Sequence, residues 1–126
     1  HGDLVKALLS AAVCVDRFPT CVVGWLVLAL IREEMDLVDD AIECLNRALY
    51  LEPSLAIVYL QMARLYSRKG HLDNLNLAIN NFRKLVSNYS PDSVLPNSSG
   101  LLVRDAVLLV DQLDQCHGRQ MWAPSL

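Results

Sequence analysis

The chain has 126 residues, of which 53% are hydrophobic, 6% aromatic and 20% charged, a composition that suits one compact, aliphatic-rich domain and excludes a disordered chain. Its formal net charge of −3 leaves no overall basic field to attract phosphate backbones, so we expect no nucleic-acid partner. The longest apolar run, residues 21–31, contains Gly24 and is far shorter than the roughly 20 residues that span a bilayer, so we expect no membrane segment.

The cysteine and histidine content predicts neither a metal nor a cofactor site. The four cysteines stand at Cys14, Cys21, Cys44 and Cys116, with no paired metal-ligand spacing. Three of them lie inside aliphatic helical patterns, where cysteine acts as a small buried hydrophobe. Without a disulfide framework or a secretory leader, we expect a fragment of a protein from a reducing cytoplasm.

A period of 34 residues organises the sequence. It separates Ala7 from Ala41, Pro19 from Pro53 and Trp25 from Tyr59. A fixed period of this size is typical of stacked helical repeats, and 34 residues is the tetratricopeptide spacing. We therefore predict an all-α fold, a superhelix of antiparallel helix pairs with a helix that caps its C-terminal end.

Residues 1–19 are expected to form half a repeat, a second helix at residues 3–17 that ends before Pro19. Small residues recur at Ala7, Ala11 and Cys14. Because a repeat cannot bury its apolar face alone, the missing first helix should leave apolar side chains uncovered, namely Leu4, Leu8, Leu9, Val13 and Val15. Homodimerisation through this open N-terminal face, or exchange of segments between chains, therefore stays open.

Residues 20–54 carry the best match to the repeat motif, with Trp25, Leu28, Ala29, Ala41, Leu45, Ala48 and Pro53 at the required offsets. Arg32 departs from the usual tyrosine, which should weaken packing at that turn. Asp36, Asp39 and Asp40 should cap the second helix, since neighbouring carboxylates on a helix do not converge on one catalytic or metal site.

Residues 55–91 form the next predicted repeat, with Lys69-Gly70 as a helix stop. The distance from Tyr59 to Ala78 is 19 positions, whereas that from Trp25 to Ala41 is 16. About one helical turn therefore seems to be inserted around residues 73–77, in or before the second helix.

Residues 92–126 are predicted to begin with a Ser-, Asn- and Pro-rich loop at 92–100, in which Ser98 or Ser99 would cap the next helix. That helix, residues 101–115, should cover the open end of the stack with a stripe formed by Leu102, Ala106, Leu109 and Leu113. Residues 117–126 show no clear period.

The first helices of such repeats line a concave groove. The corresponding positions are Val23, Leu26, Leu30, Glu33 and Glu34 in one repeat and Ile57, Leu60, Arg64, Ser67 and Arg68 in the next. One interpretation is a groove for an amphipathic segment, with an acidic group near Arg64 and Arg68. The other is that the apolar positions are covered by missing sequence and the arginines are solvated. Co-chaperone members hold a peptide carboxylate with Lys and Asn at groove positions where this chain has Leu26, Leu30, Leu60 and Arg64.

The wording of residues 41–113, with ALYLEP at residues 48–53 and a Pro-containing loop before one closing helix, resembles the C-terminal repeat region of some bacterial CheR-type chemoreceptor methyltransferases. The resemblance implies a non-catalytic module that binds a chemoreceptor, another signalling protein or its own methyltransferase domain. The alternatives are a generic adaptor or a homodimerisation domain of an unrelated bacterial signalling protein.

Overall fold

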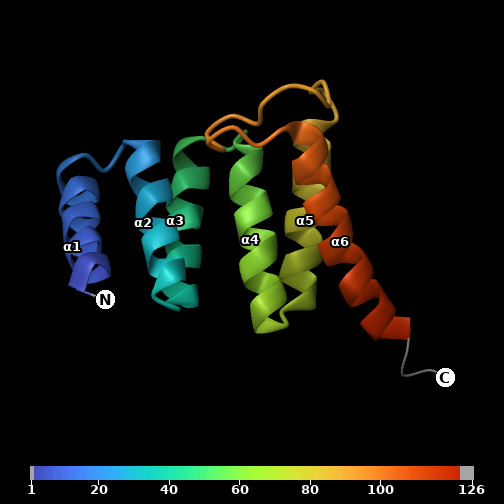
Figure 1. Ribbon diagram of the computed structural model, residues 1–126, viewed down its shortest axis with the longest axis horizontal. Coiled ribbons are helices and arrows are strands. Elements are labelled where there is room, and N and C mark those ends of the chain that lie inside the picture. Colours follow the sequence, from blue (N-terminus) through green and yellow to red (C-terminus); the bar gives the residue numbers. More distant parts are fainter. Residues whose placement is uncertain (1, 123–126) are drawn as a thin grey trace. The chain divides into compact units, whose positions relative to one another are not determined.

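The computed structural model describes the backbone of residues 2–122 and the side chains of residues 2–116. This part of the chain contains six α-helices and no β-strand, which confirms the all-α class (Figure 1). No helix within it is long and apolar enough to cross a membrane. The chain divides into two compact units, His1–Ser54 and Leu55–Leu126.

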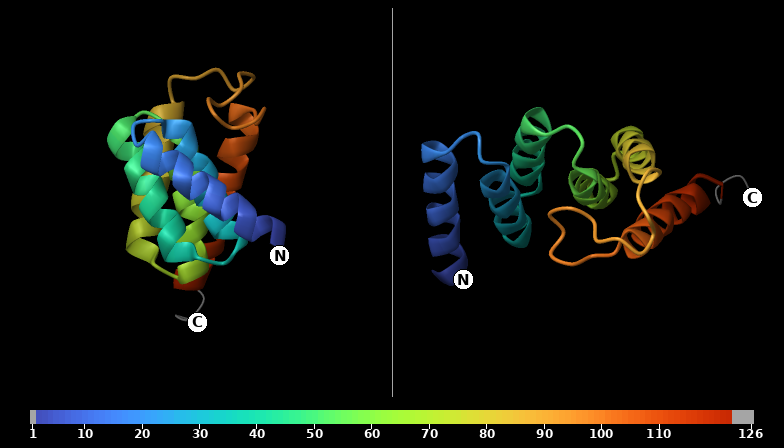
Figure 2. Two further views of the ribbon diagram at one scale, coloured as in Figure 1. Left: turned by 90° about the vertical axis from the view of Figure 1, so that its left-hand side faces the viewer. Right: turned by 90° about the horizontal axis from the view of Figure 1, so that it is seen from above.

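The first unit consists of α1 (Gly2–Arg17), α2 (Val22–Glu34) and α3 (Val38–Leu51). Each helix runs antiparallel to the preceding one, and α2 packs against both α1 and α3 (Figures 1 and 2). Gly24 permits the close approach of α1, since a Cβ atom there would lie 3.3 Å from Cγ1 of Val15. Between α2 and α3 the core is fully closed, with Leu28, Leu45 and Ala48 each at most 1% exposed.

The second unit consists of α4 (Ala56–Lys69), α5 (Leu72–Val86) and α6 (Val103–Trp122). The first two helices form an antiparallel pair, and α6 packs against both of them. Gly70 ends α4 in the left-handed conformation, at a φ of 75°, where a side chain would be strained. Leu75, Phe82 and Val110 are completely buried in the core of this unit.

The 34-residue period appears in the helix bounds. Helices α2 and α4 begin at Val22 and Ala56, 34 residues apart, and α3 and α5 begin at Val38 and Leu72, again 34 apart. The prediction of an inserted turn near residues 73–77 is therefore wrong. Leu75, not Ala78, holds the position that corresponds to Ala41, because α5 places large residues where α3 has small ones.

The loop before α6 differs from the predicted helix start. Ser98 does not cap α6, since its Oγ accepts the amide N–H of Leu101 at 3.0 Å and donates to the carbonyl of Leu95 at 2.5 Å. The amide of Leu95 in turn donates to the Leu101 carbonyl at 2.8 Å. These bonds close the loop on itself, so helix α6 begins two residues later than predicted, at Val103, and continues to Trp122.

The buried stripe of α6 is also rotated from the predicted one. Val103, Ala106 and Val110 are buried, whereas Leu102 and Leu113 are half-buried and Leu109 is exposed. The amide of Val103 donates to the Ser93 carbonyl at 2.9 Å, and this bond to the loop helps to set the rotation of the helix.

Aspartate side chains do not provide the predicted cap of α3. The capping position is Leu37, which makes no side-chain cap hydrogen bond, and Asp36 precedes it with a positive φ of 62°. Asp39 and Asp40 lie in the first turn, where their charge complements the helix dipole.

Candidate protein-binding surfaces

An apolar edge of α2, formed by Val23, Val27 and Leu30, faces solvent. These side chains are 56%, 45% and 45% exposed. Val23 and Leu30 were predicted as groove residues, whereas Val27 was not, although its spacing of four and three residues from them marks the same helix face. Leu26, also predicted, is buried and belongs to the core. The edge ends at the half-buried Glu33 and the exposed Glu34.

The predicted groove positions of α4 divide into a core part and an accessible part. Ile57 and Leu60 are buried, so they contribute to packing as the alternative interpretation expected. Arg64 and Ser67 are half-buried and Arg68 is exposed. Since Arg64 and Arg68 are four residues apart, they lie on one face of α4, near its C-terminal end.

The first unit also contains a cleft of about 410 Å³ that sequence reasoning missed. It is lined by Ala12, Val15, Asp16, Pro19, Trp25, Leu28, Arg32, Glu43 and Arg47. The indole N–H of Trp25 donates to the Pro19 carbonyl at 2.8 Å. The guanidinium of Arg47 lies 5.9 Å from the centre of the Trp25 ring, within the range of a cation–π contact. The cleft thus has an aromatic wall and charged groups of both signs.

Arg32, the departure from the repeat motif, bridges α2 and α3. Its Nη1 donates to the carbonyl of Asp40 at 3.2 Å and to Sγ of Cys44 at 3.0 Å. Burial raises the pKa of the Cys44 thiol, and the positive charge of Arg32 opposes that shift only in part. The polar bridge therefore replaces the expected aromatic packing at this turn, and the thiol stays protonated at neutral pH.

The outer face of α1 carries a second apolar stripe, formed by Val5, Leu9 and Val13, which are 47%, 62% and 53% exposed. Of the other side chains predicted to be uncovered, Leu4 and Leu8 are half-buried and Val15 is buried against α2. Exposed and buried apolar residues thus occupy opposite sides of α1.

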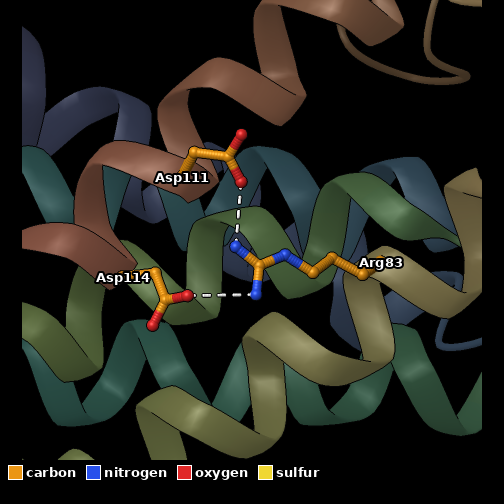
Figure 3. A network of polar contacts seen from close by, with 3 residues as sticks. All are labelled: Arg83, Asp111 and Asp114. Carbon is orange, nitrogen blue, oxygen red and sulfur yellow. Dashed lines mark hydrogen bonds and ion pairs between the residues drawn. The ribbon is translucent and has the colours of Figure 1, made fainter. Parts of the chain in front are cut away.

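In the second unit, an ion-pair network joins α5 to α6 (Figure 3). Nη2 of Arg83 lies 2.8 Å from Oδ1 of Asp111, and Nη1 lies 3.1 Å from Oδ2 of Asp114. Hydrogen bonding to Asp111 raises the pKa of the Arg83 guanidinium above its already high value. The network positions α6, and its three side chains are each more than 40% exposed.

Among the described side chains, no three His, Cys, Asp or Glu residues gather as a metal site would require. All four cysteines are free thiols. No protein-family model matches the chain, and no curated protein is similar enough to count as a relative.

Proposed function

We propose that the chain is a non-catalytic protein–protein interaction module built from tandem helix pairs of the tetratricopeptide type. The observation that carries the proposal is the repetition of the buried positions. Of the nine buried residues of α2 and α3, eight correspond to a buried residue 34 positions later, in α4 or α5. The exception is Ile42, which corresponds to the exposed Asn76. Helix pairs repeated in this way commonly present extended binding surfaces.

The apolar edge of α2 supports a binding role. Three aliphatic side chains at spacings of four and three residues match the anchors of an amphipathic helix, which reads a surface through the same spacing. On α4, Arg64 and Arg68 offer positive charge to an acidic group of a partner. We infer that the partner is a protein segment with an apolar face and acidic residues.

Within this proposal, the parent protein is a bacterial chemotaxis-type protein-glutamate methyltransferase, and the module targets or regulates the enzyme in the cytoplasm. The support is the resemblance of residues 48–53 and of the loop with its closing helix. The four free thiols agree with a reducing compartment. The alternative is a generic adaptor of another signalling protein.

The test is deletion of these residues from the full-length parent, followed by measurement of receptor methylation and of receptor binding. Loss or redistribution of methylation supports the proposal, and an unchanged rate, site choice and partner binding would overturn it. A parent without an adenosylmethionine-binding domain would overturn the methyltransferase assignment and leave the adaptor. Leu30→Asp should weaken partner binding at least tenfold, whereas Leu108→Asp, on a residue of α6 that is 57% exposed, serves as the matched control.

A further inference from the structure

Helix α1 is apolar on two opposite sides, and only one of them has a partner within the described chain. Ala11 and Val15 face α2 and are at most 8% exposed, whereas Leu9 on the other side is 62% exposed. A helix that is apolar on both sides is normally covered on both. The exposed stripe of Val5, Leu9 and Val13 therefore calls for an occupant.

The spacing of this stripe is symmetric about its middle residue. Val5 and Val13 each lie four residues from Leu9. In an antiparallel pair of two α1 helices, a two-fold axis beside Leu9 brings the two Leu9 side chains together and sets Val5 against Val13 of the second copy. The stripe is thus complementary to itself, which is what an isologous contact requires.

The charged residues that flank the stripe distinguish the two orientations of such a pair. Asp3 and Lys6 lie in the first half of α1, and Asp16 and Arg17 lie in its last turn. In the antiparallel orientation Lys6 comes within about one helical turn of Asp16 of the second copy, and Asp3 within one turn of Arg17. In a parallel pair each charge would instead meet its own copy, and like charges in contact oppose association.

From this symmetry and charge complementarity we propose that a second copy of this chain covers the outer face of α1, with the two α1 helices antiparallel and Leu9 at the two-fold axis. The opposed helix dipoles favour the same orientation. A single helix pair buries less area than the roughly 1,600 Å² of a standard interface, so the dimer is of the weak, concentration-dependent class. This inference goes beyond the proposed function, since it concerns a different surface and does not depend on a partner protein.

Sedimentation of the purified chain over a range of concentrations tests the dimer. We expect a reversible shift from monomer to dimer at micromolar concentrations. Leu9→Asp should weaken dimerisation about 100-fold, because it brings two carboxylates together at the axis. Leu77→Asp is the matched control, since Leu77 is also an exposed leucine, at 60% against 62%, and should leave the dimer unchanged. A monomer at all concentrations, or equal effects of both variants, would overturn the inference while leaving partner binding by α2 unaffected.

Charge reversal and cross-linking test the orientation. Lys6→Glu should weaken the dimer about tenfold through two symmetric ion pairs, and adding Asp16→Lys should restore it. Leu9→Cys should form a disulfide with its own copy. Val5→Cys should cross-link to Val13→Cys in a mixture but not to itself, with mass spectrometry separating these bonds from those of native cysteines. Failure of the charge rescue, or self-linking of Val5→Cys, would exclude the antiparallel arrangement.

Discussion

Two leucines of α5, two positions apart, provide a direct test of the repeat register. Leu75 is completely buried, whereas Leu77 is 60% exposed. In Leu75→Ala, loss of the buried methyl and methylene groups costs about 2 kcal/mol of transfer free energy. The cavity that remains raises the expected loss of unfolding free energy to about 3–4 kcal/mol. Leu77→Ala removes groups that are mostly hydrated already, so it should cost less than about 0.7 kcal/mol.

Urea unfolding followed by circular dichroism measures the difference, with hydrogen exchange of the α5 amides locating it. The two variants share chemistry, helix and neighbourhood, so helix propensity cancels between them. If residues 73–77 formed a turn inserted outside the repeat register, neither leucine would occupy a core position and both losses would be small. Losses that are equal within about 0.5 kcal/mol would therefore refute the register derived from the helix bounds.

Three further predictions concern polar groups. The side-chain oxygen Oε1 of Gln61 is buried and makes no hydrogen bond, so Gln61→Met should raise the unfolding free energy by about 1 kcal/mol, and a lower melting temperature would contradict this. Arg83→Met removes both ion pairs of a solvent-exposed guanidinium, so the loss should stay below about 1 kcal/mol and should disappear relative to the parent chain in 1 M salt, as thermal unfolding at two ionic strengths would show. Burial raises the pKa of Cys44 above its ordinary value of 9.0, so the folded thiol keeps its proton while the unfolded thiol ionises. Its contribution to stability is thus complete below that value and falls as the pH rises through it; Cys44→Ala should flatten this part of the pH profile, and an unchanged slope would show that the thiol is not responsible.

Sequence reasoning anticipated the features that depend on local spacing. The apolar periodicity and the breaks at Pro19, Pro53 and Gly70 predicted where α1 to α4 lie, to within a few residues. These signals are local, because proline lacks an amide donor and glycine alone tolerates the left-handed turn at no cost. The exposed stripe of α1 was likewise anticipated at Leu9 and Val13, since half a repeat leaves one face uncovered.

Sequence reasoning failed where several apolar faces competed on one helix. In α6 both Leu102–Leu109 and Val103–Val110 form plausible stripes, and hydrogen bonds from the preceding loop, not spacing, favour the second. The cleft beside Trp25 was missed for a related reason, because its charged wall comes from three helices and no single segment carries the pattern.

The sequence by itself determined the 34-residue period, the helical class and the positions of the breaks, because each follows from propensity and spacing along one segment. Only the tertiary structure decided that Leu75 and Phe82 stand where α3 has Ala41 and Ala48, and that Arg32 reaches Cys44 in place of an aromatic contact. Both are matters of volume and polarity shared between helices, and a close-packed interior settles them only when the partners are in place.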